Sequence, residues 1–268
     1  MAEDVLRFEK VSKSFGSVKA LKNASFALRA GEVVALLGDN GAGKSTLIKC
    51  VSGVHRIDGG RIYVQGQQVS IRSAREAMAL GIETIHQDTS LAPDLSIARN
   101  LFLGREPVLL PFLGVFAPIN GKKLRESASA LLQRVGISKK LDSHAPVSTL
   151  SGGERQSIAI SRAMQFAAQV IILDEPTNNL GVEETHGVLR FIQQVRDAGH
   201  AVLLVTHNIH HVFEVADRIV VMRRGEVTAE LTVADTDLLT VESQITGTDM
   251  AVLMHDARKR STERRPHG

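Results

Sequence analysis

The sequence predicts an α/β fold with a mostly parallel sheet, an N-terminal antiparallel β subdomain and an inserted α-helical lobe. Short apolar runs such as 33–37 and 170–173 alternate with segments of helical periodicity, as expected for parallel strands covered by helices. Residues 5–36 also alternate between apolar and polar positions on both sides of a turn near 15–17, which indicates antiparallel strands. Residues 88–168 contain several prolines and then helical periodicity, and we interpret them as the lobe.

The chain of 268 residues is long enough for one large domain with an inserted lobe. We place this domain at residues 1–250, with the α/β core and β subdomain at 5–87 and 169–225 and the helical lobe at 88–168. Residues 251–268 form a basic tail. The tail is either a disordered end or an element attracted to anionic lipid headgroups or to a partner.

The formal net charge of +3 is concentrated at the end of the chain. From Ala257 onward there are five Lys/Arg and one Glu, a local +4, so residues 1–256 carry 3 − 4 = −1. This nearly neutral body argues against nucleic acid as a partner. The single cysteine, Cys50, excludes an internal disulfide, and no apolar run approaches the roughly 20 residues of a membrane span. We therefore expect a cytoplasmic protein.

Residues 38–46 fit the spacing G-x-x-x-x-G-K-[ST] of a phosphate-binding loop, and we call them the phosphate loop. Their glycines allow successive backbone N–H groups to turn toward phosphate oxygens. An apolar strand precedes the loop and a helix follows it, which is the context that P-loop NTPases require. We expect Lys44 to reach the outer phosphates and Ser45 to reach a magnesium ion. The expected nucleotide-binding residues are Gly38, Asp39, Asn40, Gly41, Ala42, Gly43, Lys44, Ser45 and Thr46.

The remaining elements follow from the same periodicities and from helix-capping patterns. In chain order we expect a hairpin at 59–67, a helix capped by Ser73 and Glu76 that ends before Gly81, a strand at 82–86, a helix over 124–135, a strand at 170–174, a helix that ends at Gly199, and strands at 201–206 and 219–222.

One segment of the lobe, 108–116, is unusually apolar. Pro111 and Gly114 interrupt it, and it is too short to cross a bilayer. It is either a partner-binding loop or part of the core of the lobe.

The stretch Leu150–Glu154, Leu-Ser-Gly-Gly-Glu, predicts a second anion site, and we call it the LSGGE segment. Ser151 and Glu154 have capping-box spacing, and the glycines between them expose backbone N–H groups at the start of a helix. The helix dipole and these donors favour a phosphate. Because the chain already has a phosphate loop, a second anion site suggests contact with the nucleotide of another subunit. The alternative is an ordinary capped helix.

The strand at 170–173 ends in two acids, Asp174 and Glu175. In a parallel sheet, ligands bind beyond the carboxyl ends of the strands, so Asp174 is expected beside the phosphate loop. There it would hold magnesium together with Ser45. Glu175 would orient and polarise the attacking water as a general base. The alternative is a pair of solvated acids at a strand end.

The motifs together resemble the ATPase subunits of ATP-binding cassette (ABC) transporters. The resemblance is carried by 38–46, Gln87, 150–156, 171–177 and His207, in this order and spacing. It implies that two cassettes pair head to tail around two ATP molecules with Mg²⁺, as a homodimer or with a second cassette.

The resemblance also implies roles for single residues. Ser151, Gly152 and Gly153 would cover the partner subunit's ATP. Gln87 would contact magnesium or the attacking water, and His207 would hold the γ-phosphate and Glu175. Phe15 matches the position that stacks on adenine, although a phenylalanine in a hairpin is as often part of the core.

Further residues, from 87 to 106 and from 207 to 218, are similar to the ATPases of bacterial carbohydrate importers of the ribose, xylose and fructose type. This similarity implies membrane permease subunits as partners, a periplasmic sugar-binding protein as an indirect partner, and a position on the inner face of the cell membrane. Gly181 stands where the family has an aspartate that reaches the opposite loop. Two alternatives stay open, a nucleotide-gated regulatory or clamp module with weak turnover and a soluble cassette ATPase without a transport role.

Overall fold

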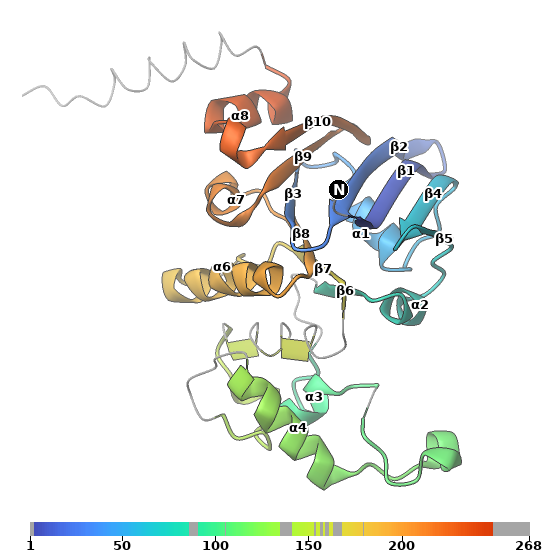
Figure 1. Ribbon diagram of the computed structural model, residues 1–268, viewed down its shortest axis with the longest axis vertical. Helices are drawn as coiled ribbons and strands as arrows, with labels where there is room; N and C mark the ends of the chain where they lie inside the picture. The colour runs from blue at the N-terminus through green and yellow to red at the C-terminus, as the bar shows by residue number, and fades with distance from the viewer. Residues whose placement is uncertain are drawn as a thin grey trace, which may run out of the picture.

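The computed structural model consists of two sheets with flanking helices and a helical lobe below them (Figure 1). It describes residues 3–85, 91–104, 106–134, 141–152, 154–155, 158, 161–162, 168–178 and 180–248.

The central sheet has six strands in the order β10-β9-β3-β8-β7-β6. All neighbours pair in parallel except β10, which runs antiparallel to β9 at one edge. The mostly parallel sheet is therefore confirmed, whereas the sequence analysis missed β10, whose side chains are nowhere fully buried. The strands are β3 (Val33–Leu37), β6 (Ile82–Ile85), β7 (Val170–Asp174), β8 (Ala201–Val205), β9 (Arg218–Arg223) and β10 (Glu226–Thr232).

The second sheet has four antiparallel strands in the order β2-β1-β4-β5. It confirms the antiparallel β subdomain, and the predicted hairpin joins it through pairing of β4 with β1. The long first strand places Leu6, Phe8 and Val11 in the core. The strands are β1 (Asp4–Phe15), β2 (Val18–Arg29), β4 (Gly59–Val64) and β5 (Gln67–Val69).

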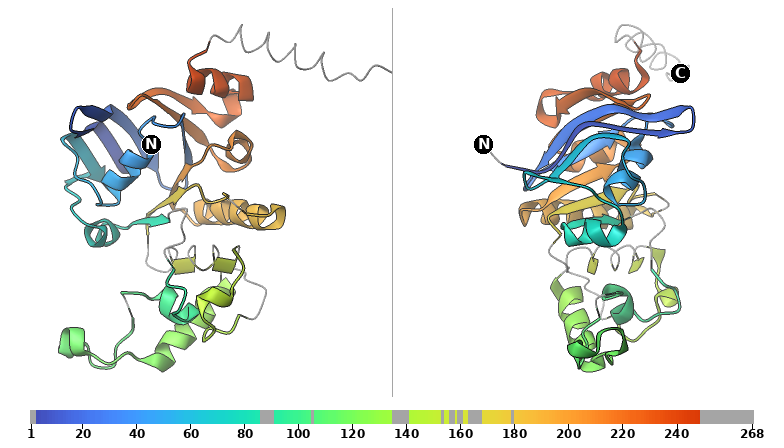
Figure 2. Two further views of the ribbon diagram at one scale, coloured as in Figure 1. Left: turned by 180° about the vertical axis from the view of Figure 1, so that it is seen from behind. Right: turned by 90° about the vertical axis from the view of Figure 1, so that its right-hand side faces the viewer.

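The two faces of β3 belong to two different cores. Val34 and Leu36 pack with the four-stranded sheet and with helix α1 (Lys44–Val51). The alternate residues of β3 pack with three helices that cover the other face of the central sheet (Figure 2). These helices are α6 (Val182–Asp197), α7 (Ile209–Val215) and α8 (Leu238–Thr246). Because both faces are covered, β3 is an uninterrupted apolar run rather than an alternating one.

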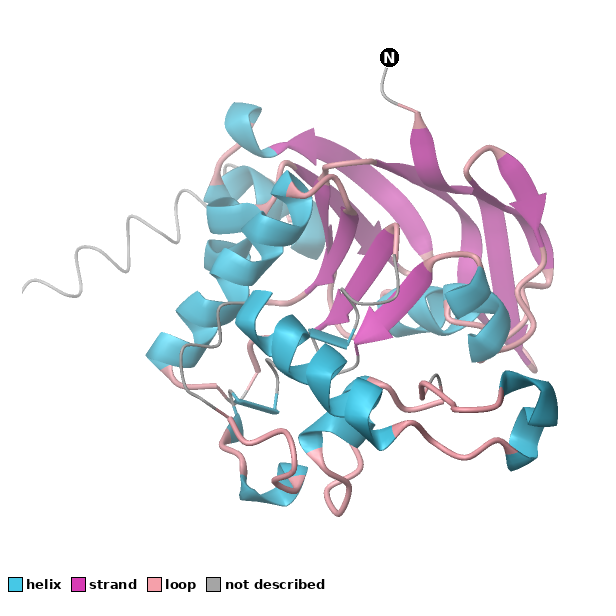
Figure 3. Ribbon diagram, turned by 60° about the horizontal axis from the view of Figure 1, so that its bottom comes forward, coloured by secondary structure: helices cyan, strands magenta, loops and turns pink. Residues whose placement is uncertain are grey.

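The lobe has its own core, formed by α3 (Ile97–Leu101), α4 (Gly121–Arg134) and residues Val147, Leu150 and Ile158 (Figure 3). Two short 3₁₀ helices, η1 (Pro111–Phe116) and η2 (Val147–Thr149), belong to the lobe as well. A third, η3 (Val233–Asp235), follows β10. Across the described ranges, no helix is both long and apolar enough to cross a membrane.

The predicted cap of α2 (Ala74–Ala79) is half right. Ser73 Oγ accepts a hydrogen bond from Glu76 N at 3.2 Å. The Glu76 carboxylate, however, accepts from Arg72 N at 2.8 Å instead of from Ser73 N. The Glu76 carboxylate therefore binds the backbone of Arg72, the residue before the N-cap, and links it to the first turn of α2.

The apolar segment 108–116 does not enter the core of the lobe. Val108 and Ile119 form a bridge, and Leu109 N donates to Pro118 O at 2.9 Å, so the segment is the end of a hairpin that extends from the lobe. Phe112 is 80% exposed and Phe116 is 87% exposed. The interpretation as lobe core is wrong, and the interpretation as a binding loop stays a prediction.

Asn100 in α3 anchors the segment that enters the lobe. Its side chain is fully buried. Asn100 Oδ1 accepts from Ala92 N at 2.7 Å, and Nδ2 donates to the carbonyl oxygens of Ala92, Leu95 and Ser96 at 2.9–3.2 Å. One amide thus satisfies several backbone groups that are cut off from water.

We predict that Asn100→Leu lowers the free energy of unfolding by about 2–3 kcal/mol, because it leaves the Ala92 N–H without a partner in the interior. Asn120→Ala is a matched control, since Asn120 caps α4 through one exposed bond to Lys123 N and should cost only about 1 kcal/mol. Urea unfolding of both variants tests this. Equal losses would show that the buried amide does not anchor the lobe.

Candidate nucleotide-binding site

The phosphate loop connects the carboxyl end of β3 to α1, as predicted. Gly38 has φ 152° and Gly43 has φ 107°, a region that favours glycine. Close backbone neighbours demand glycine as well, because a Cβ at Gly38 would overlap Met222 O and a Cβ at Gly43 would lie 2.7 Å from Ala20 O. The loop is therefore held tightly between β2 and β9.

The loop forms one wall of a groove of about 580 Å³. The other lining residues come from β2 and from the turn after β9. Three of them, Lys19, Lys22 and Arg224, are cations that the sequence analysis missed, and no acid is among the described lining residues. A groove of this charge suits a polyphosphate. The phosphate-loop motif does not predict these three cations, because they come from β2 and from a turn far along the chain.

Lys44 lies across the loop. Its Nζ donates to Gly38 O at 2.6 Å and to Asp39 O at 3.2 Å. Burial lowers the pKa of Lys44, and the negative charges of Glu175, Asp39 and Asp174 oppose this shift. The ammonium group is therefore within electrostatic reach of both carboxylates at the end of β7.

The register of the parallel sheet places those carboxylates. Asp174 pairs with Val205 of β8, and Glu175 N donates to Val205 O at 2.8 Å. His207 follows Val205 by two residues, and its Nδ1 lies 3.0 Å from Glu175 Oε1. The expected contact between His207 and Glu175 is present in the structure.

Glu175 has two features of a functional carboxylate. Its φ is 51°, a left-handed conformation that is unfavourable for a residue other than glycine. Its Oε2 is buried and has no hydrogen-bond partner among the described protein atoms. This oxygen therefore has an unused acceptor position among the described residues, while Oε1 faces the more exposed His207.

A second polar pair behind Glu175 was missed by the sequence analysis. Thr177 Oγ1 lies 3.2 Å from His211 Nδ1, and Asn208 Nδ2 lies 3.2 Å from His211 Nε2. Burial lowers the pKa of His211. Asn208 also caps α7. These contacts join the turn after β7 to the start of α7, so they hold Glu175 and His207 in place.

The LSGGE segment has the predicted capping box. Glu154 N donates to Ser151 Oγ at 3.2 Å, and Ser151 N donates to Glu154 Oε2 at 2.9 Å. Gly152 lies near Leu180, where an added Cβ would be 3.9 Å from Leu180 Cδ2. No residue of the segment is among the described residues that line the groove at the phosphate loop. Gln87 and Gly153 lie outside the described residues.

Phe15 is not a core residue, so that alternative is wrong. It is 44% exposed at the end of β1. Its ring meets His55 edge-on with centroids 5.1 Å apart, and Lys13 Nζ lies 5.5 Å from its centroid. Stacking on adenine stays a prediction for this ring.

The donor set at the site fits a magnesium ion that is held mainly by its nucleotide. The described residues include no group of three or more His, Cys, Asp or Glu that could hold a metal. One hydroxyl, Ser45, and one carboxylate, Asp174, leave the other positions to phosphate oxygens and water, which is the usual arrangement for Mg²⁺. Cys50 is buried, and burial raises the pKa of its thiol to about 11, so it is not a ligand or nucleophile.

We predict that Gly43→Ala weakens nucleotide binding by on the order of tenfold or more, because the methyl group would press on Ala20 O and displace the loop. Gly199→Ala is the control. Gly199 also has a positive φ, 91°, but an added Cβ would meet nothing within 4 Å. Equilibrium titration with a fluorescent ATP analogue measures both variants. Equal affinities would mean that the close approach to β2 does not shape the loop.

The family model for ABC transporters matches residues 21–178. Among curated proteins, a xylose/arabinose import ATP-binding protein from Sulfolobus acidocaldarius is 47% identical over 84% of this chain and 86% of that protein. A fructose import ATP-binding protein from Rhizobium meliloti is 44% identical over 83% and 86%. A ribose import ATP-binding protein from Chromobacterium violaceum is 41% identical over 90% of this chain but only 46% of its own length.

Solved structures agree on the fold. A nucleotide-free ATP-binding cassette from an ABC transporter superimposes with a TM-score of 0.77 at 24% identity, and the match covers 94% of this chain and 98% of that one. A dimeric bacterial ABC transporter cassette gives a TM-score of 0.70 at 23% identity over 85% and 98%. With the family match over more than half of its length and close relatives over most of it, the chain belongs to the ABC transporter family.

Proposed function

We propose that this protein is the ATP-hydrolysing subunit of an ABC importer that drives a sugar through a membrane permease. The observation that carries hydrolysis is the contact between Glu175 and His207 at the same sheet edge as the cationic groove of the phosphate loop. The sugar class rests on the printed functions of the relatives, which import xylose or arabinose, fructose and ribose.

The phosphate loop and Lys44 would bind the phosphates of ATP, with Phe15 against the adenine. Ser45 and Asp174 would hold Mg²⁺, with Gln87 as a further contact to the metal or the attacking water. Bound Mg²⁺ would neutralise charge on the transferring phosphoryl group. Lys44 would add a second positive charge on the same side, after leaving the carbonyl oxygens that it contacts in the free loop.

Glu175 would accept a proton from the water that attacks the γ-phosphate in line. Its Oε2, which has no hydrogen-bond partner among the described residues, would be the atom that takes the proton. His207 would hold the other oxygen, Oε1, and contact the γ-phosphate. The contacts of His211 behind the pair would keep both side chains oriented.

The groove in one chain is open, and we infer that a second cassette covers it head to tail. The partner subunit would present the N–H groups at the start of its LSGGE helix, from Ser151, Gly152 and Gly153, to the γ-phosphate. A solved cassette of the same fold is dimeric.

Gly181 cannot supply a carboxylate across this interface. It is the N-cap of α6, where its N–H donates to Glu184 Oε2 at 2.9 Å. Gly181 is the one sequence feature that supports a regulatory clamp. The Glu175–His207 contact favours hydrolysis over that alternative.

The partners would be integral permease subunits and, through them, a periplasmic sugar-binding protein. The ATPase would lie peripherally on the inner face of the cell membrane. Nucleic acid is not an expected partner, because the cations outside the tail are balanced by acids.

We predict that Glu175→Gln lowers the turnover of ATP by roughly 10²–10⁴-fold but leaves ATP affinity nearly unchanged, because only the proton acceptor is lost. Glu183→Gln, an exposed acid at the start of α6, is the control and should hydrolyse ATP normally. Phosphate release from the purified protein with its permease measures turnover. If Glu175→Gln turns over as fast as the unchanged protein, the ATPase mechanism fails.

We also predict that two inactive variants complement each other. In a heterodimer of Ser151→Arg and Lys44→Ala subunits, one composite site carries both changes and the other carries neither. Mixing the two should therefore restore part of the ATPase activity. Ser148→Arg, at an exposed position three residues before Ser151, should need no complementation. Absence of recovery at every mixing ratio would contradict a head-to-tail dimer in which each site can work alone.

A further inference from the structure

The hairpin that ends in η1 presents an unusual apolar surface, which we call the apolar tip. It lies at the far end of the lobe from the central sheet (Figures 1 and 3). Its side chains are exposed by 40–87%, although all are large and hydrophobic. The apolar tip consists of Leu109, Leu110, Phe112, Leu113 and Phe116.

The backbone of the apolar tip forms a compact turn. Leu113 N donates to Leu110 O and Ala117 N donates to Gly114 O, both at 3.1 Å, so the backbone folds back on itself. Gly114 has φ 56°. Five large apolar side chains are therefore exposed on one short segment. An exposed apolar cluster of this kind suits the fluid apolar medium of a bilayer interface.

The segment that follows the apolar tip in the chain is basic. Between Glu106 and Glu126 the sequence has no acid and three cations, Lys122, Lys123 and Arg125, all exposed at the start of α4. An apolar anchor next to a basic patch is the combination that gives stable attachment to an anionic bilayer, since either one alone is weak.

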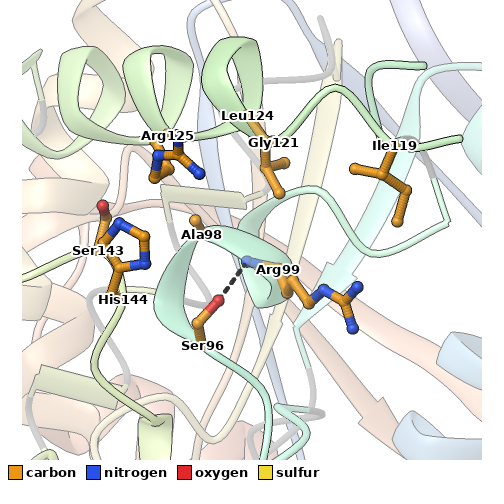
Figure 4. A pocket seen from close by; sticks show the side chains of 9 residues that line it. All are labelled: Ser96, Ala98, Arg99, Ile119, Gly121, Leu124, Arg125, Ser143 and His144. Atoms are coloured by element: carbon orange, nitrogen blue, oxygen red, sulfur yellow. Dashed lines mark hydrogen bonds between the residues drawn. The ribbon is translucent and has the colours of Figure 1, made fainter. Parts of the chain in front are cut away.

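A pocket with two arginines in its lining lies at the base of the hairpin (Figure 4). Its volume is about 250 Å³. Arg99 from α3 and Arg125 from α4 line it, and neither guanidinium has a hydrogen-bond or ion-pair partner among the described residues. Ser143 and His144 lie on the side of Arg125, whereas the guanidinium of Arg99 points away from Arg125, toward the side of Ile119 (Figure 4). Asp142, next to Ser143 in the chain, already accepts from His144 N at 2.9 Å.

The hairpin joins the pocket to the apolar tip. Ile119, which pairs with Val108 at the base of the hairpin, also lines the pocket. Each guanidinium group, without a partner among the described residues, can bind a phosphate group through two parallel hydrogen bonds. A ligand that contacts both the pocket and the apolar tip would carry an anionic phosphate next to apolar chains.

We propose that the apolar tip inserts into the interface of an anionic phospholipid bilayer and that the cations at its base, Arg99 and Arg125 among them, attract the lipid phosphates. This contact is separate from the nucleotide site and needs no permease. It goes beyond the proposed function, because it gives the ATPase a direct attachment to the lipid surface.

Cosedimentation of the full chain with vesicles tests the proposal. We expect binding to vesicles of phosphatidylcholine with phosphatidylglycerol, and much weaker binding to phosphatidylcholine alone. Phe112→Ser with Phe116→Ser should weaken binding to the anionic vesicles at least about tenfold. Arg99→Gln with Arg125→Gln should weaken it by roughly tenfold or more and reduce its dependence on salt.

Matched variants control for general loss of apolar surface or charge. Val54→Ser with Val182→Ser removes exposed apolar side chains elsewhere, and Arg75→Gln with Arg190→Gln removes exposed cations elsewhere. Both should bind vesicles like the unchanged protein. All altered side chains are at the surface, and circular dichroism with ATP titration verifies that each variant is folded.

Several outcomes would overturn the proposal. One is absence of binding to anionic vesicles, and another is unchanged binding of the double phenylalanine variant. Saturable binding of inorganic phosphate without vesicle binding would identify a site for free phosphate. If the double phenylalanine variant binds vesicles unchanged but no longer assembles with the permease, the apolar tip is a protein contact instead. Because no ATP hydrolysis is measured, failure here leaves the proposed function untouched.

Discussion

The candidate site depends on the parallel register at the centre of the six-stranded sheet. Val205 of β8 pairs with Leu36 of β3 on one side and with Asp174 of β7 on the other. The carboxyl ends of the three strands therefore stop at the same edge. The phosphate loop, the two acids and His207 leave that edge together, although up to about 170 residues separate them in the chain. Both faces of β3 pack in a core, so the strand is held from both sides.

The rigid sheet also holds backbone conformations that a looser structure would relax. Glu175 keeps a positive φ, and Gly38 and Gly43 approach the backbones of neighbouring strands too closely for any side chain. A non-glycine residue in this conformation costs of order 1–3 kcal/mol and persists where the surroundings over-determine it. Here Oε1 of Glu175 faces His207, and Oε2 has no hydrogen-bond partner among the described atoms. Elsewhere in the described chain, Lys10, Asn23, Gln65 and Arg224 also have a positive φ, so this conformation is not confined to the site.

The lobe adds functions that the sheet cannot supply. Its LSGGE segment begins a helix that no described contact brings to the phosphate loop of the same chain. Its hairpin extends an apolar tip away from the core, and two arginines without partners among the described residues lie at its base. Asn100 holds the entry of the chain into this lobe with a fully buried amide. The lobe thus carries both surfaces for which we propose a partner, a second cassette at one and a lipid interface at the other.

The sequence by itself determined what depends on a few neighbouring residues. The phosphate loop with its strand and helix, the capping box of Ser151 and the alternating strands of the β subdomain all follow from local spacing. Tertiary structure decided the rest. The Glu175–His207 and Thr177–His211 pairs join residues more than 30 positions apart, and no local pattern reports such contacts. Tertiary packing also decided that 108–116 is exposed, because the same apolar run can be buried or exposed depending on what covers it. Likewise, the pairing of β10 at the edge of the sheet depended on which surfaces other elements cover.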